Sequence, residues 1–190
     1  MKLSIDLLNN LIDITSNSAI ACFPYIGKNE KILADKSATD VMRDMLNKLN
    51  INGEVVIGEG ELDEAPMLYI GEKLGKGKGP NIDIAVDPVE GTNFVAKNLP
   101  GAMSVLAVSE KGNLFNAPET YMEKIAVGNH VPKDTIDLDF SVEKNIKNYS
   151  NATSKNPNEI TVCILDRPRH KKIISELIRL NVNIKYISEW

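Results

Sequence analysis

The chain has 190 residues, of which 43% are hydrophobic and 25% are charged, and its 22 basic and 26 acidic side chains give a formal net charge of −4. This hydrophobic fraction is typical of folded globular proteins and excludes extensive disorder. The mildly acidic balance argues against a broad nucleic-acid-binding surface. If such a protein handles phosphate groups, it must attract them locally, through a metal ion or a few placed cations.

The N-terminus lacks the pattern of a secretory signal, because acidic and amide residues interrupt its apolar positions. No apolar run approaches the roughly 20 residues that a membrane-spanning helix requires. We therefore expect a soluble, cytoplasmic protein with no membrane and no nucleic-acid partner. The two cysteines, Cys22 and Cys163, both stand between apolar neighbours, which favours buried, reduced thiols.

Two helices are predicted near the start of the chain. Apolar residues recur at helical spacing across residues 3–24 and again across residues 38–49. Ser37 and Asp40 have the spacing of an N-cap followed by an acidic first turn. The second helix is therefore expected to begin at residue 38.

Three strands are predicted in the following segment. Short apolar runs at residues 54–57, 82–86 and 104–108 are each bounded by glycine, proline or charged residues. The turn signal Glu-Lys-Gly at residues 110–112 predicts that the third strand pairs with residues 113–115 as a hairpin.

The last third of the chain has a different pattern. Residues 141–150 are polar and favour a helix, and residues 151–158 form a polar, linker-like run. Apolar residues 160–165, a helical pattern at 169–180 and a strand pattern at 182–187 then follow in order. Strand, helix and strand in this order predict a βαβ unit with parallel strands. We place the domain boundary at the linker, which gives domains at residues 1–157 and 158–190.

Acidic residues cluster at the ends of predicted elements. Asp35 precedes the second predicted helix, Gly-Glu-Gly-Glu occupies residues 58–61 after the first strand, and Asp-Pro-Val-Glu-Gly-Thr occupies residues 87–92 after the second. Sites in α/β proteins are commonly assembled at the ends of strands. Taken singly, each cluster has an ordinary explanation as a solvated loop charge, a turn or a helix entry. The full string at 87–92, together with the upstream Gly-Glu-Gly-Glu, is far more specific.

Crowded carboxylates repel one another unless a cation lies between them. Ligation by oxygen alone suits hard ions such as Mg²⁺ or Mn²⁺, and these ions suit phosphate chemistry. Two such ions can activate a water molecule and stabilise the leaving oxygen of a phosphate ester. The hydroxyl of Thr92, which follows the turn, is placed to orient that water. The sequence therefore predicts a metal-dependent phosphatase.

The string at residues 87–92 resembles the signature of the lithium-sensitive, metal-dependent sugar and inositol phosphatase superfamily. Two longer stretches, residues 57–72 and 116–124, resemble class II fructose-1,6-bisphosphatase of the GlpX type. The resemblance covers essentially the whole chain and is densest from Ile57 to Gly128. It implies a layered α-β-α-β sandwich of the sugar phosphatase type and hydrolysis of the 1-phosphate of fructose 1,6-bisphosphate, a step of gluconeogenesis that is also linked to glycerol metabolism.

The resemblance also assigns roles to positions of this sequence. It implies metal-binding carboxylates, with Mn²⁺ or Mg²⁺ as cofactor, at Asp35, Glu59, Asp87 and Glu90. It implies catalytic roles for Thr92, Glu59 and Asp87, and substrate contacts at Glu90, Gly91, Thr92, Tyr121, Arg167, Pro168 and Arg169. Arginine pairs bidentately with phosphate oxygens, which fits the last assignment. The alternative for Arg167 and Arg169 is ordinary surface charge at the start of a helix.

Family members continue beyond this length, so the resemblance implies a truncated second domain. We therefore expect a homo-oligomer or association with a separately encoded C-terminal half. Two alternatives remain open. One is a related phosphatase that acts on sedoheptulose bisphosphate or an inositol phosphate, because the metal motif recognises the phosphate and not the sugar. The other is an inactive or partner-dependent remnant of the enzyme.

Overall fold

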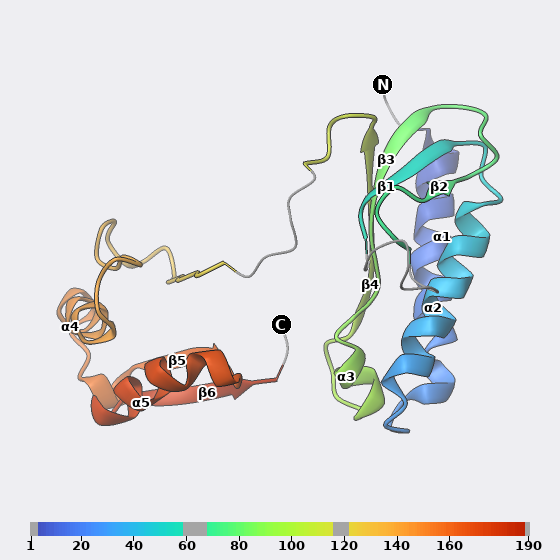
Figure 1. Cartoon of the computed structure of the whole chain (residues 1–190). Coiled ribbons are helices and arrows are strands. Elements are labelled where there is room, and N and C mark those ends of the chain that lie inside the picture. Colours follow the sequence, from blue (N-terminus) through green and yellow to red (C-terminus); the bar gives the residue numbers. More distant parts are fainter. Residues whose placement is uncertain (1–3, 59–67, 116–121, 189–190) are drawn as a thin grey trace. The chain divides into compact units, whose positions relative to one another are not determined.

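The computed structural model describes residues 4–58, 68–115 and 122–188. These residues form a mixed α/β structure with five α-helices and two β-sheets (Figure 1). The elements are α1 (Ile5–Ala21), α2 (Lys31–Leu46), β1 (Asn52–Ile57), β2 (Lys73–Leu74), β3 (Asn81–Glu90), α3 (Thr92–Ala96), β4 (Met103–Glu110), α4 (Val142–Thr153), β5 (Thr161–Leu165), α5 (Lys171–Arg179) and β6 (Asn183–Ile187). None of the described helices is long and apolar enough to cross a membrane.

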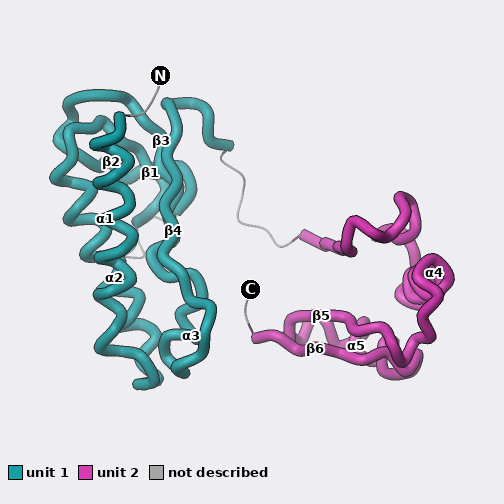
Figure 2. Tube along the Cα trace, turned by 180° about the vertical axis from the view of Figure 1, so that it is seen from behind, with its two compact units in different colours: residues 1–118 teal, residues 119–190 magenta. Residues whose placement is uncertain are grey.

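The chain divides into two compact units, Met1–Pro118 and Glu119–Trp190 (Figure 2). The sequence places a boundary near residue 157 instead. The contacts explain the difference, because Ile146 of α4 shares a buried cluster with Leu177 of α5 and Val182. The helix predicted at residues 141–150 is confirmed as α4, and its buried Ile146 joins it to the second unit.

The first unit is a four-stranded sheet in the order β2-β1-β3-β4, with α1 and α2 along one face (Figure 1). β1 and β3 are parallel, whereas β2 and β4 are antiparallel to their neighbours. The core between the helices and the sheet is made of buried apolar side chains, among them Leu7, Ile14, Met42, Leu46, Ile51, Val55, Leu68, Leu74, Ile82, Ile84 and Val86. Alternate residues of β1 and β3 supply this core, as expected for strands with one face against helices.

The first predicted helix is confirmed as α1, and Ser4 caps it by accepting a hydrogen bond from the Leu7 N–H at 3.1 Å. The predicted start of the second helix is wrong, because α2 begins at Lys31. Ser37 lies inside the helix and donates its hydroxyl to the Tyr25 hydroxyl at 3.2 Å. The start of α2 gave no clear helical pattern, because Ile32 and Leu33 are exposed there and only small residues such as Ala34 are buried.

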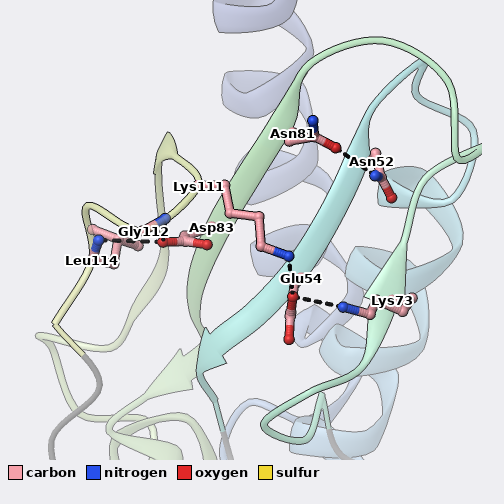
Figure 3. Close-up of polar contacts among 8 residues, drawn as sticks. All are labelled: Asn52, Glu54, Lys73, Asn81, Asp83, Lys111, Gly112 and Leu114. Carbon is pink, nitrogen blue, oxygen red and sulfur yellow. Dashed lines mark hydrogen bonds and ion pairs between the residues drawn. The ribbon is translucent and has the colours of Figure 1, made fainter.

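The predicted hairpin between residues 104–108 and 113–115 is also wrong. A turn does form, with the Asn113 N–H donating to the Glu110 carbonyl at 3.1 Å, but no strand follows it in the described residues. β4 pairs with β3 instead. The buried Asp83 carboxylate accepts from the Gly112 N–H at 2.6 Å and the Leu114 N–H at 3.4 Å (Figure 3). The Leu114 N–H, which belongs to the predicted second strand, is thus bonded to Asp83 instead.

The second unit contains the predicted βαβ arrangement. β5 and β6 are parallel and α5 connects them. Its buried cluster consists of Ile146, Ile160, Leu177 and Val182, with partly buried neighbours from α4 and the strands. Cys163 alternates to the outer face of β5 and is exposed, so the expectation of a buried thiol is wrong there, whereas Cys22 is buried as expected.

Candidate metal centre

The end of β3 carries two of the predicted carboxylates. β3 does not stop at Pro88, because Pro88 and Val89 are both buried and the strand runs to Glu90. Asp87 pairs with Val105 and Glu90 pairs with Met103, so the register shifts between them. Proline cannot donate to the strand ladder, which explains an irregularity at this point.

This irregularity has a direct effect on Asp87. The Val89 N–H donates to the Asp87 carboxylate oxygen Oδ1 at 3.1 Å. This hydrogen bond from the nearby backbone restrains the Asp87 side chain. The second carboxylate oxygen of Asp87 remains available for a ligand. The hydrogen bond and the strand together restrict the orientation of this carboxylate.

The turn after β3 requires glycine. Gly91 has φ of +82°, in the left-handed region, and precedes α3. A Cβ atom at this position would lie 2.7 Å from Cδ2 of Phe94, so any other residue would both be strained and clash. The Gly91 carbonyl accepts from the Phe94 N–H at 2.8 Å. Glu90 and the half-buried Thr92 therefore flank one sharply defined turn.

Asp35 lies in the first half of α2. Its Oδ1 atom is buried and has no hydrogen-bond partner among the described residues. Burial raises the pKa of the Asp35 carboxyl above its ordinary value. The pKa of the neighbouring Cys22 thiol is raised to about 11, first by burial and then by the charge of Asp35. An unpaired buried carboxylate is costly, and a bound cation is one way to satisfy it.

A second apolar cluster packs the ends of these elements together. It joins Cys22, Ala34, Ala38, Val89 and Val95, with Tyr25 packed against it. Asp35 follows a member of this cluster, and Glu90 follows another. The first half of α2, the end of β3 and α3 therefore meet in one packed region, and each contributes a predicted site residue.

Two of the predicted site residues are not among those that the structure describes. Glu59 and Tyr121 lie outside the described residues. Within the described part of the chain, no three or more His, Cys, Asp or Glu side chains lie close enough to hold a metal ion. The oxygen chemistry and the unsatisfied Asp35 fit a hard cation, and Asp87 and Glu90 share the strand end with the glycine turn.

The remaining predicted contacts belong to the second unit. Arg167 precedes a short 3₁₀ turn that contains Pro168 and Arg169, at the carboxyl end of β5. The Arg167 guanidinium donates to the Asp166 carbonyl at 3.4 Å, and His170 Nδ1 lies 2.8 Å from the Leu165 carbonyl. The structure thus gathers these residues into one loop of the second unit.

Comparison with known proteins identifies the family. The sequence model of the family of bacterial, glpX-encoded fructose-1,6-bisphosphatase matches residues 5–189. Fructose-1,6-bisphosphatase 1 class 2 of Escherichia coli K12 is 48% identical over 171 residues, which cover 90% of this chain. This chain belongs to the class II, GlpX-type fructose-1,6-bisphosphatase family. The sequence resemblance drawn above is confirmed.

A relative from Synechococcus strain CC9902, named D-fructose 1,6-bisphosphatase class 2/sedoheptulose 1,7-bisphosphatase, is 45% identical over 183 residues, or 96% of this chain. The aligned residues make up 51% and 54% of the Escherichia coli and Synechococcus proteins, so the chain spans about half the length of the curated relatives it matches. Among solved structures, an extragenic suppressor from Pyrococcus furiosus aligns with a TM-score of 0.38 and 21% identity, covering 55% of this chain and 40% of that one.

Sequence reasoning missed two polar anchors of this class II chain. Asp83 interrupts an apolar strand and fixes the loop after β4. Arg43 of α2 makes a two-pronged ion pair with the buried Glu72, at 2.6 Å and 3.1 Å. Asp83 had a signal, since a charge at an inward strand position requires a partner. Arg43 and Glu72 are 29 residues apart in sequence, and no local sequence pattern indicates their pairing.

Proposed function

We propose that this chain carries the metal-binding part of a cytoplasmic class II fructose-1,6-bisphosphatase. The reaction would be hydrolysis of the 1-phosphate of fructose 1,6-bisphosphate, which gives fructose 6-phosphate and phosphate in gluconeogenesis. The observation that supports this most strongly is the family match across residues 5–189. The glycine turn at the end of β3, flanked by Glu90 and Thr92, gives that match a physical basis.

In this proposal Mn²⁺ or Mg²⁺ would be held by Asp35, Glu59, Asp87 and Glu90. When bound, such ions lower the pKa of a water molecule and neutralise charge on the phosphate. The role of the protein itself is to hold these carboxylates in position. The backbone N–H of Val89 restrains Asp87, and the buried cluster that includes Ala34 and Val89 packs α2 against the strand end.

The Thr92 hydroxyl would accept a hydrogen bond from the attacking water and orient it toward phosphorus. The Glu90-Gly91-Thr92 turn would line the substrate, with Tyr121 as a further contact. Arg167 and Arg169 would bind a substrate phosphate, with Pro168 restricting the loop backbone between them.

The test is release of phosphate from fructose 1,6-bisphosphate by the purified chain, with Mn²⁺ or Mg²⁺ and with a chelator as control. We expect metal-dependent release that drops on the order of 10²-fold in Thr92→Val. Thr161→Val, at an exposed position of β5, is the matched control and should leave activity unchanged. Absence of release from a chain shown to be folded by circular dichroism would contradict activity of this chain.

A second candidate substrate is sedoheptulose 1,7-bisphosphate. The observation that favours it is the printed name of the Synechococcus relative, which includes that activity. Rates on fructose 1,6-bisphosphate, sedoheptulose 1,7-bisphosphate and an inositol phosphate, measured side by side, distinguish the candidates. A clear preference for the inositol phosphate would contradict the sugar-bisphosphate assignment.

A further candidate is a chain that acts only with a partner. It rests on the observation that the alignment covers about half of each relative. In that case the purified chain is inactive and gains metal-dependent activity when a separately expressed C-terminal half of a class II enzyme is added. Full activity without any added chain would exclude this candidate.

A further inference from the structure

An ion pair in the first unit joins α2 to the segment that precedes β2. Arg43 Nε lies 2.6 Å from Glu72 Oε1, and Arg43 Nη2 lies 3.1 Å from Glu72 Oε2. Only 22% of the Arg43 side chain and 11% of the Glu72 side chain are exposed. Because two parallel hydrogen bonds restrict orientation as well as distance, this pair ties the two elements together in one geometry.

Glu72 belongs to a segment, residues 68–72, whose backbone is bonded to β1. The Val55 N–H donates to the Glu72 carbonyl at 2.9 Å, and the Gly71 N–H donates to the Val55 carbonyl at 2.7 Å. Leu68, at the start of the segment, is fully buried in the core of the first unit. Residues 68–72 and the middle of β1 are therefore one hydrogen-bonded structure, and the Arg43 pair attaches it to α2.

The same segment lies against the end of β1. A Cβ atom on Gly58 would be 2.2 Å from the Leu68 carbonyl oxygen, a backbone atom that no side-chain movement can displace. Only glycine allows this close approach. A contact that fixes residues 68–72 therefore also restrains Gly58, where the chain leaves β1. Glu59, one of the proposed metal ligands, follows Gly58 in the sequence.

Arg43 lies on the helix that carries another proposed ligand. Asp35 precedes Arg43 on α2 by about 12 Å along the helix axis. Ligands that come from separate elements must be held within about 0.5 Å of the productive geometry. A link of fixed geometry between α2 and the residues beside β1 meets this requirement.

We propose that Arg43 is a positioning residue of the metal centre. Through Glu72 it holds residues 68–72, and with them the end of β1, at a fixed distance from the helix that carries Asp35. Arg43 itself binds neither metal nor substrate in this proposal. The inference rests on the proposed metal-dependent function and adds a residue to which the family resemblance assigns no role.

The first test separates positioning from stability. Arg43→Met leaves the charge of Glu72 without this partner, so it should lower both the melting temperature and the affinity for Mn²⁺. Arg43→Met/Glu72→Met replaces the whole pair by apolar side chains, which generally preserves stability but fixes no orientation. We expect the double variant to regain the native melting temperature and still to bind Mn²⁺ about tenfold more weakly in calorimetry.

The second unit offers a matched control, because Arg179 and Glu143 also form an ion pair, at 2.7 Å. Arg179→Met/Glu143→Met should leave the affinity for Mn²⁺ unchanged. Native affinity in Arg43→Met/Glu72→Met would overturn the proposal, since the pair would then serve only stability. A native chain that binds no Mn²⁺ would contradict the proposed function instead.

The second test needs no metal. In the chelator-treated chain, hydrogen exchange at the Gly71 N–H reports the contact between residues 68–72 and β1. In Arg43→Met/Glu72→Met we expect this exchange to accelerate about tenfold, while β3 keeps its protection. Unchanged exchange at Gly71 would overturn the proposal at any affinity for Mn²⁺.

Discussion

The two compact units differ in the size of their apolar cores and in the charge of their candidate site residues. The first unit encloses a core between two helices and a four-stranded sheet, and it carries the described carboxylates Asp35, Asp87 and Glu90. The second unit has a two-stranded sheet, four buried apolar side chains in its cluster, and Arg167 and Arg169 on a loop. The carboxylates proposed as metal ligands thus lie on the larger core, and the arginines proposed to bind phosphate lie on the smaller one.

The difference suggests a division of labour that mutation can test. A metal site tolerates little displacement of its ligands, so it benefits from strands and helices that are locked by packing. An arginine that binds phosphate acts through a long side chain and tolerates more movement. Changes in the first unit should therefore affect catalysis itself, and changes in the second should affect substrate affinity and local stability.

The largest expected effect is on catalysis. Asp87→Asn should lower kcat for fructose 1,6-bisphosphate on the order of 10³-fold, because it removes the charge of a proposed metal ligand at the end of β3. Steady-state kinetics at saturating Mn²⁺ provides the measurement. Asp139→Asn, an exposed carboxylate of the second unit, is the control, and equal loss in both variants would show that Asp87 has no special role.

The second unit provides the contrasting kinetic variant. Arg169→Ala should raise KM for the bisphosphate by roughly tenfold with a smaller change in kcat, because it removes a proposed phosphate contact and leaves the proposed metal ligands in place. The split between KM and kcat separates the two units. A fall in kcat as large as that of Asp87→Asn would remove the distinction between them.

Stability should also divide between the units. Leu177→Ala deletes a fully buried side chain of the small cluster and should cost about 2–4 kcal/mol. Hydrogen exchange should then show loss of protection in β5 and β6 while β3 keeps its protection. Met42→Ala, fully buried in the first unit, should do the reverse. If either substitution exposed both units to the same degree, the two cores would be one cooperative structure.

Asp35 should show the conflict between function and stability. Asp35→Asn should stabilise the chelator-treated protein at pH 7, because burial disfavours the charged form of Asp35. The native pKa of Asp35 is raised by burial, so its ionised form destabilises the fold above the unfolded-state pKa of about 3.9. The advantage of asparagine should therefore shrink as the pH falls through the native and then the unfolded pKa. Thermal melts from pH 7 to 3 measure it, and an advantage independent of pH would contradict this cause.

The smallest effect is expected at Glu54 of β1, a central strand of the first sheet. Glu54 accepts from Lys73 at 2.6 Å and from Lys111 at 3.0 Å (Figure 3), and these contacts lower its pKa. Glu54→Gln should cost about 0.5 kcal/mol at pH 7. Since the native pKa is depressed, this contribution is present above the unfolded value of about 4.3 and is lost as the pH falls through the native pKa. Melts in about 1 M salt should also reduce it.

Much of the fold could be predicted where apolar residues recur at one clear spacing, either that of a helix or that of a strand. The apolar repeat of α1 and the strand-helix-strand order of the second unit are of this kind. The early start of α2 could not be predicted, because Ala34 and Ala38 bury small side chains that give a weak pattern. The failed hairpin depended on Asp83, which lies 29 residues before Gly112, a contact that no local pattern encodes.

The candidate site divides in the same way. The string at residues 87–92 could be recognised from sequence because its glycine and proline constrain the backbone itself, as the bulge before Glu90 and the positive φ of Gly91 illustrate. The environment of Asp35 could not be foreseen. Its unpaired oxygen and its proximity to Cys22 result from packing between α1 and α2, which only the folded chain creates.

The most direct test of the central claim is Mn²⁺ binding to the chelator-treated chain, followed by calorimetry or by the electron paramagnetic resonance signal of free Mn²⁺. The claim is that the first unit of this class II chain holds a divalent cation through Asp35 and the end of β3. We expect at least one saturable site in the native chain and its loss in the Asp35→Asn/Asp87→Asn double variant. A folded native chain that binds no Mn²⁺, or a double variant that binds it equally well, would contradict the account.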